Sequence, residues 1–99
     1  PVLAILTGDR RVDRRKLSAV IGASKVKIAS PEATKELTGF TVGSMPPVGH
    51  PDGTRIVIDR KVMTLSKAYG GYGIPNVLIE IDPEDIARLT GAKVADICE

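Results

Sequence analysis

The segment Gly43-Ser44-Met45-Pro46-Pro47-Val48-Gly49-His50 is the part of the sequence best suited to hold a ligand through its backbone. Its two consecutive prolines fix φ near about −65° and stiffen the chain. Gly43 and Gly49 let a ligand approach the backbone closely. Rigid N–H groups can stabilise a carbonyl oxygen that gains charge during acyl transfer, and the Ser44 hydroxyl can add a hydrogen bond. The alternative is a plain connecting loop.

Two further side chains have types that suit proton transfer. Asp59 follows the apolar run Ile56–Ile58, where its carboxylate could lie at a pocket rim and orient water or an amine. His50 follows the proline-rich segment and could carry a proton near neutral pH. The alternatives are a turn-forming aspartate and an exposed turn histidine. No Gly-x-Ser-x-Gly pattern supports a hydrolase triad.

Charge is concentrated in one stretch. Residues 9–27 hold seven basic and two acidic residues, a local charge of +5, whereas the whole chain carries +2 and its C-terminal end is acidic. Such a patch attracts a polyanion because it releases counterions from phosphates. The alternative is a solvated helix face. The basic residues are Arg10, Arg11, Arg14, Arg15, Lys16, Lys25 and Lys27.

Length and composition limit the class of protein. The 99 residues, 42% of them hydrophobic, suit a single domain over 1–99 with its own core. No apolar run is long enough to cross a bilayer. The single Cys98 and single His50 predict neither a disulfide nor a metal site, so we expect no cofactor and a reducing, cytoplasmic setting. Three aromatic residues offer little base stacking.

Short strands and short helices alternate along the chain. Hydrophobic patterns predict strands over Val2–Leu6, Val26–Ala29, Arg55–Ile58, Val62–Leu65 and Val77–Ile81. Capping residues predict helices that begin after Asp13, Ser30 and Asp82 and end at Gly22, Gly39 and Gly91. Loops are expected over 43–53 and 69–75.

Two of these units match at a constant shift of 52 residues. The first runs from Val26 through Pro31 to Gly39, and the second runs from Leu78 through Pro83 to Gly91. This match indicates either an internal duplication or two helices that obey the same capping rules. In both cases we expect the two helices to dock on the sheet in a similar way.

The ordered motifs of the chain resemble the YbaK family, the aminoacyl-tRNA deacylase domains related to the editing insertion of bacterial prolyl-tRNA synthetases. The resemblance implies a mixed α/β fold with a curved, partly closed sheet and surrounding short helices. It also implies hydrolysis of the ester that links a wrong amino acid, such as Cys or Ala, to a tRNA, with a proline tRNA expected. The motifs are Leu6-x-Gly8-Asp9-Arg10-Arg11-Val12-Asp13, Ala29-Ser30-Pro31-Glu32, Leu37-Thr38-Gly39, Gly43-x-x-x-Pro47, Ile58-Asp59 and Leu89-Thr90-Gly91-Ala92.

The resemblance also implies roles for individual residues. Gly43 to Pro47 match the Gly-x-x-x-Pro loop that holds the aminoacyl-adenosine end, and Asp59 matches an acidic residue near the pocket. We therefore expect Gly43, Ser44 and Asp59 in catalysis, with Met45, Pro46, Pro47, Gly49 and His50 in substrate binding. The expected tRNA-binding residues are Arg10, Arg11, Arg14, Arg15 and Lys16.

The chain departs from the family pattern at one point. A family lysine lies in a segment N-terminal to the strand that begins here at Val2, and nothing in the sequence matches it. We expect either that the sequence lacks its first part or that this is a shortened member. The alternative function is a non-catalytic tRNA-binding or interaction module. An aminoacyl-tRNA synthetase is a further expected partner, and an open edge on the first strand would allow oligomers.

Overall fold

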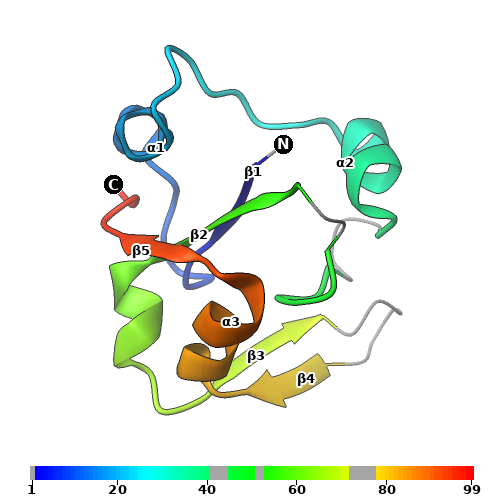
Figure 1. The fold of residues 1–99 in the computed structure, drawn as a ribbon, viewed down its shortest axis with the longest axis vertical. Coiled ribbons are helices and arrows are strands. Elements are labelled where there is room, and N and C mark those ends of the chain that lie inside the picture. Colours follow the sequence, from blue (N-terminus) through cyan, green and yellow to red (C-terminus); the bar gives the residue numbers. More distant parts are fainter. Residues whose placement is uncertain (1, 41–44, 51–52, 72–77) are drawn as a thin grey trace.

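The computed structural model describes residues 2–40, 45–50, 53–71 and 78–99. Figure 1 shows the elements and their labels. In chain order they are β1 (Val2–Ile5), α1 (Arg14–Ile21), α2 (Pro31–Thr38), β2 (Arg55–Asp59), the 3-10 helix η1 (Arg60–Thr64), β3 (Ala68–Gly71), β4 (Leu78–Ile81), α3 (Pro83–Thr90) and β5 (Lys93–Ala95). None of the helices in these ranges is long and apolar enough to pass through a membrane.

The strands form two sheets. β2 lies between β1 and β5 in a parallel sheet, with Ala4 opposite Val57 and Ile58 opposite Val94. β3 and β4 form an antiparallel pair, with Tyr69 opposite Glu80. The predicted mixed α/β fold is confirmed. In the described ranges the sheets are separate, and closure of a single curved sheet is not seen there.

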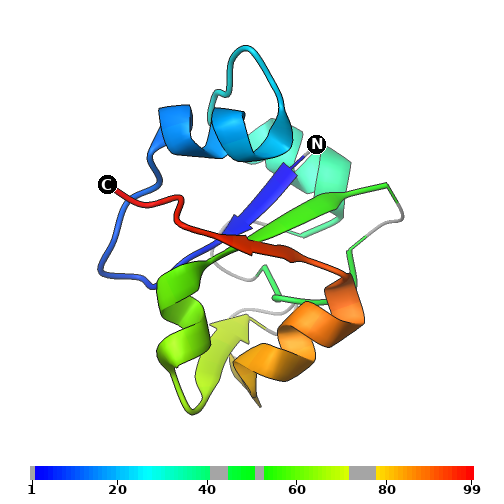
Figure 2. The same cartoon turned by 60° about the vertical axis from the view of Figure 1, so that its left-hand side comes forward.

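The core has two parts, one on each face of β2. Successive strand residues point to opposite faces, so Val57 joins Leu17 and Ile97 while Ile58 joins Val62 and Ile86. Figure 2 shows the consequence, with α1 on one side of the parallel sheet and η1 and α3 on the other. The sheet is thus covered on both faces, as parallel sheets normally are.

Two predicted strands are wrong. Residues 26–29 pair with no described strand, although Val26 packs on the core. Val62–Leu65 lies mostly in η1, because the Asp59 carboxylate accepts a hydrogen bond from the Lys61 N–H and begins a helical turn. Val62 is buried from this turn, so burial alone could not distinguish strand from helix in a four-residue apolar pattern.

Helices α2 and α3 share their capping but not their packing. Both have eight residues, with Pro in the first turn and a left-handed glycine at the end, as the match at 52 residues predicts. However, α3 buries Pro83 and Ile86, whereas α2 buries no residue. The expectation that they dock alike is therefore wrong. The residue of α2 that corresponds to Ile86 is Thr34, which removes the main apolar contact.

Candidate functional site

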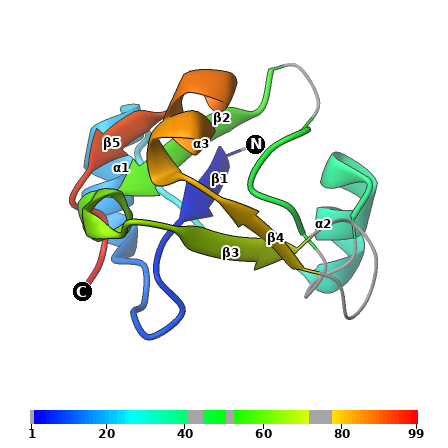
Figure 3. The same ribbon diagram turned by 90° about the horizontal axis from the view of Figure 1, so that it is seen from below.

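A cavity of about 490 Å³ lies beside β1, between the turn that follows this strand, the loop residues Met45–Pro47, and β3. Figure 3 shows these segments together, with β3 running just below β1 and the loop beside both. The lining side chains are mostly apolar, and they include Val62 and Ile86 from the core. The size and lining suit a small-molecule ligand or the end of a larger one.

Contact between Pro47 and Gly70 sets one wall of this cavity. A Cβ atom on Gly70 would stand 2.9 Å from Pro47 Cδ and 3.3 Å from Pro47 Cγ. The proline ring therefore packs directly on the backbone of β3, where a side chain would push it away. A glycine inside a strand is a sequence signal for such close approach. The loop expected over 69–75 is wrong at residues 69–71, which lie in β3, and the contact with Pro47 was not predicted.

Predicted substrate-binding residues divide into two groups. Met45, Pro46 and Pro47 line the cavity, whereas Gly49 and His50 line a separate space of about 220 Å³. His50 Nε2 lies 2.7 Å from the carbonyl oxygen of Pro46 and therefore donates to it. The prediction that His50 carries protons for the substrate has no support in this position. Its contact instead holds the proline-rich loop.

His50 makes a second contact that fixes its ring. The ring packs edge-on against Phe40, with 5.6 Å between the centroids, and its Nδ1 is buried without a hydrogen-bond partner in the described part of the chain. Gly49 has φ +83, a left-handed conformation that glycine adopts without strain. Gly43 and Ser44, predicted as catalytic, lie outside the described residues.

Asp59 lies at the end of β2 and is only 1% exposed. Its Oδ2 atom accepts from Arg10 Nη1 at 3.0 Å and from the Lys61 N–H at 3.2 Å, and its Oδ1 atom accepts from the Ile97 N–H at 3.1 Å. It contributes to a separate hollow of about 300 Å³ and does not line the cavity. Among the described residues Asp59 therefore lies outside the cavity lining, and its role in catalysis stays a prediction.

The C-terminal residues 96–99 fasten the stretch Arg10–Lys16, which we call the basic segment. The Asp13 N–H donates to the Ile97 carbonyl at 2.7 Å, and the Glu99 N–H donates to the Arg11 carbonyl at 2.9 Å. Lys16 Nζ lies 2.8 Å from the carbonyl oxygen of Cys98. Backbone and side-chain contacts together hold the basic segment in one conformation.

Four arginines of the basic segment surround an open hollow of about 800 Å³. Arg11, Arg14 and Arg15 are exposed, whereas Arg10 pairs with Asp59 and Lys16 pairs with Asp96 at 3.1 Å. Leu6 lines both this arginine hollow and the cavity, so the two are adjacent. The lining also includes Asp13 and Glu99, so the positive charge is partly offset. We use the name arginine hollow for this space, which is lined by Arg10, Arg11, Arg14 and Arg15.

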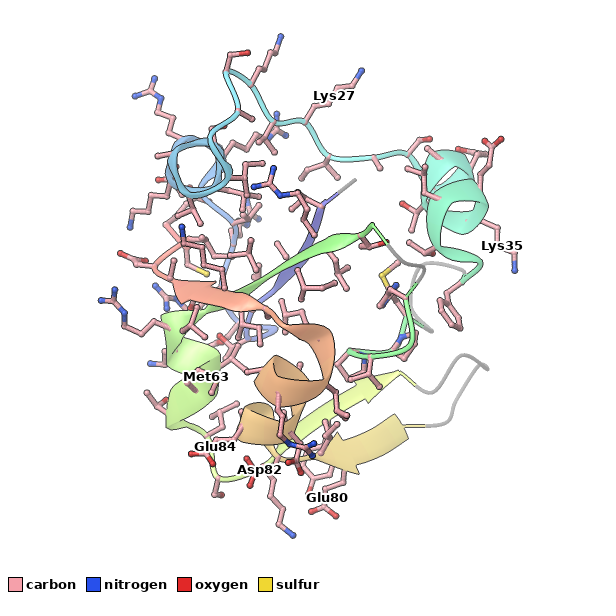
Figure 4. The ribbon with its side chains drawn as sticks, viewed as in Figure 1. Lys27, Lys35, Met63, Glu80, Asp82 and Glu84 are labelled. Atoms are coloured by element: carbon pink, nitrogen blue, oxygen red, sulfur yellow. The ribbon has the colours of Figure 1, made fainter. Side chains whose placement is uncertain are left out.

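Charge is segregated over the molecule. Figure 4 shows Glu80, Asp82 and Glu84 gathered near the end of β4 and the start of α3, while Lys27 and Lys35 project elsewhere. Glu80 accepts from the Tyr69 hydroxyl at 3.1 Å and pairs with Lys67 at 3.3 Å. Lys67 and Tyr69 also line the cavity, so this charged group lies at its edge.

Three titratable groups are shifted by their surroundings. The Lys16 ammonium lowers the pKa of Asp96, and a nearby Thr7 hydroxyl lowers the pKa of the exposed Asp9 carboxyl. The oxygen of that hydroxyl is buried and has no hydrogen-bond partner among the residues that the structure describes. Burial, followed by the charge of Asp59, raises the pKa of the Cys98 thiol. The described residues offer no cluster of three ligands for a metal ion.

Cys98 is expected to report whether the C-terminal residues stay docked. Its side chain is fully buried and its raised pKa keeps it a thiol at neutral pH, so alkylation requires release of this segment. We expect iodoacetamide to label the native protein at pH 8 at least about tenfold more slowly than the urea-unfolded chain. Mass spectrometry of timed samples measures both rates. Equal rates would contradict a docked C-terminus.

Comparison with known proteins identifies the family. The model for the aminoacyl-tRNA editing domain matches residues 1–89. The chain belongs to the aminoacyl-tRNA editing domain family. The resemblance noted from the sequence motifs is thereby confirmed.

Relatives of this editing domain include much longer proteins. The chain is 31% identical to a proline–tRNA ligase of Streptococcus mutans over 100 residues, which cover 100% of the chain and 16% of the ligase. A proline–tRNA ligase of Streptococcus agalactiae is 41% identical over 71 residues, which cover 72% of the chain and 12% of the ligase. The chain thus spans less than a fifth of the length of these relatives.

Solved structures with the same fold are also longer than the editing domain described here. Hypothetical protein APE2540 matches with a TM-score of 0.92 and 36% identity, over 99% of this chain and 65% of that one. A protein described as a candidate trans-editing enzyme for prolyl tRNA synthetase matches with a TM-score of 0.84 and 34% identity, over 94% of this chain and 59% of that one.

Proposed function

We propose that this editing domain is an aminoacyl-tRNA deacylase that acts in trans on mischarged tRNA. The observation that carries the proposal is the adjacency of the apolar cavity and the arginine hollow, which share Leu6. The cavity suits the aminoacyl end of a tRNA, and the hollow suits the phosphates that precede it. Membership of the editing family supports the same assignment.

The reaction needs little from protein side chains. Water attacks the ester carbonyl, the bond to the ribose oxygen breaks, and that oxygen takes up a proton. The proline-rich loop lines the cavity with Met45, Pro46 and Pro47, and its backbone is held by Pro47 on β3 and by the hydrogen bond from His50. Of these three residues only Met45 has a backbone N–H, and a rigidly held N–H group can stabilise a developing oxyanion without reorganisation. We expect no cofactor.

The proposed substrate is a small amino acid, such as Cys or Ala, on a proline tRNA. The matched proline–tRNA ligases and the neighbour described as a candidate trans-editing enzyme for prolyl tRNA synthetase support this choice. For cysteine, the resemblance implies that the substrate's own thiol can attack the ester carbonyl in place of water. A cyclic thioester then forms as the bond to the ribose oxygen breaks, and the thiol proton passes to that oxygen. Met45 lies in the cavity lining and would limit the size of the amino acid. An aminoacyl-tRNA synthetase is proposed as a partner.

A deacylation assay tests the proposal. Alanyl-, cysteinyl- and seryl-tRNA are incubated with the protein, with prolyl-tRNA as the correctly charged control, and the released amino acid is measured. We expect release from at least one mischarged tRNA and none from prolyl-tRNA. Binding of tRNA without release of any amino acid would favour the alternative, a non-catalytic tRNA-binding module.

Neutralising two exposed arginines is expected to weaken tRNA binding. The double change Arg14→Gln and Arg15→Gln removes two charges from the arginine hollow, so the slope of log affinity against log salt should become shallower by about 1.5 units. Fluorescence titration at several salt concentrations measures the slope. The control is Lys35→Gln with Arg88→Gln, which removes equal charge from residues outside the hollow. An equal effect of the two pairs would contradict a local site.

A further inference from the structure

Asp59 and Arg10 form an ion pair beside the arginine hollow, with Asp59 buried and Arg10 partly exposed. Arg10 Nη1 lies 3.0 Å from Asp59 Oδ2, and Arg10 is 28% exposed while Asp59 is 1% exposed. Arg10 Nη2 also donates to the Glu99 carbonyl at 3.4 Å. The guanidinium is therefore fixed at one side by a carboxylate on β2 and at the other by the C-terminal backbone, and it still lines the arginine hollow.

Arg10 also ends the turn that forms a wall of the cavity. The Arg10 N–H donates to the Thr7 carbonyl at 3.1 Å, and Thr7 and Gly8 line the cavity. One residue thus belongs to the cavity turn through its backbone and to the arginine hollow through its side chain. A shift of Arg10 would move both surfaces relative to each other.

Asp59 also helps to hold the rest of the basic segment in place. Its Oδ1 atom accepts from the Ile97 N–H, and the Ile97 carbonyl accepts from the Asp13 N–H. The carboxylate therefore fixes Arg10 directly and the basic segment through the C-terminal residues. Among the described residues its hydrogen-bond partners are Arg10, Lys61 and Ile97, and none of these three lines the cavity.

We propose that Asp59 is a positioning residue that fixes Arg10, and thereby keeps the arginine hollow and the cavity in register for the phosphate backbone and the aminoacyl end of one tRNA. This inference rests on the proposed function. The residue acts through another residue, in contrast to the catalytic role expected from the sequence. The ligand that Arg10 and its neighbours would contact is the acceptor end of a nucleic acid, which carries several phosphates.

The direction in which tRNA affinity changes in Asp59→Asn distinguishes a positioning role from a purely electrostatic one. Asp59→Asn removes a negative charge, so Coulomb attraction alone would strengthen binding of a polyanion. Positioning requires the opposite, because Arg10 loses its charged partner and its fixed direction. We expect tRNA affinity to fall about tenfold and the salt slope to become shallower by about one unit, the value for one lost phosphate contact.

The substrates and controls make the test specific. The kcat/KM for an intact mischarged tRNA should fall about tenfold or more in Asp59→Asn, and less for 3′-aminoacyl-adenosine, which has no phosphate backbone. Asp85→Asn is the matched control, because it removes one negative charge from an exposed pair with Arg88 outside both surfaces. It should leave affinity and turnover unchanged.

A second variant provides a test even if Asp59→Asn folds poorly. Arg10→Lys keeps the charge but loses the planar fork that reaches Asp59 and the Glu99 carbonyl together. We expect a severalfold loss on tRNA and little loss on 3′-aminoacyl-adenosine. Tighter tRNA binding by Asp59→Asn, or equal losses on both substrates in either variant, would overturn the inference. Absence of deacylation by the unchanged protein would instead count against the proposed function. The tRNA affinities of the variants would still test the positioning role of Asp59.

Discussion

Asp59→Ala is expected to lower the free energy of unfolding by about 3 kcal/mol, the low end of the cost of removing one partner from a buried charge pair. The carboxylate accepts hydrogen bonds from Arg10, Lys61 and Ile97, and alanine leaves all three donors without this acceptor. Partial exposure of Arg10 lets water replace one of them, so we take the lower value. Urea unfolding followed by circular dichroism measures the change.

The control for this loss is an exposed ion pair of the same charge types. Asp85 and Arg88 lie 3.2 Å apart with side chains 51% and 70% exposed, so Asp85→Ala should cost at most about 0.5 kcal/mol. A loss below about 1 kcal/mol for Asp59→Ala would mean that water satisfies the freed donors. The buried carboxylate would then not organise the C-terminal segment.

Gly70→Ala is expected to reduce kcat/KM for deacylation by about 100-fold, the effect of displacing a positioning group by roughly 1 Å. The added methyl group would stand 2.9 Å from Pro47 Cδ, closer than carbon atoms pack, so the proline-rich loop must move away from β3. The fold should survive, because Gly70 lies outside both buried clusters. Steady-state kinetics on a mischarged tRNA and a thermal melt measure the two effects separately.

A second glycine of the same cavity provides the matched control. Gly8 also lines the cavity, but a Cβ atom on it would meet no atom of the described residues within 4 Å. Gly8→Ala should therefore lower deacylation much less than Gly70→Ala does. Equal losses in the two variants would show that any added methyl group blocks the substrate, and that contact between Pro47 and Gly70 does not set the loop position.

The helix boundaries were predictable because they depend on local chemistry. Asp13, Ser30 and Asp82 accept hydrogen bonds from first-turn N–H groups, and the glycines after each helix adopt the left-handed conformation. The strand over 55–58 and the first strand were predicted for a similar reason, since both are short apolar runs bounded by turn residues. These features involve residues within a few positions of each other.

The failures involve contacts between distant residues. Residues 26–29 alternate like a strand, but the structure places no described partner beside them. The candidate site divides in the same way. Met45 to Pro47 line the cavity as expected, whereas His50 and Asp59 turn towards Pro46 and Arg10. Residue type indicated proton transfer for these two side chains, whereas the tertiary structure gives each a hydrogen-bond partner within the protein.

The sequence by itself determined the family, the helix ends, the stiff proline-rich loop and the concentration of basic residues in the first third of the chain. Only the tertiary structure decided that the arginine hollow adjoins the cavity at Leu6, and that Asp59 binds Arg10 across 49 positions of sequence. The physical reason is the distance along the sequence over which each interaction acts. Capping and loop stiffness arise from neighbouring residues, but a buried carboxylate binds whichever donor the packed sheet and the C-terminal segment bring to it.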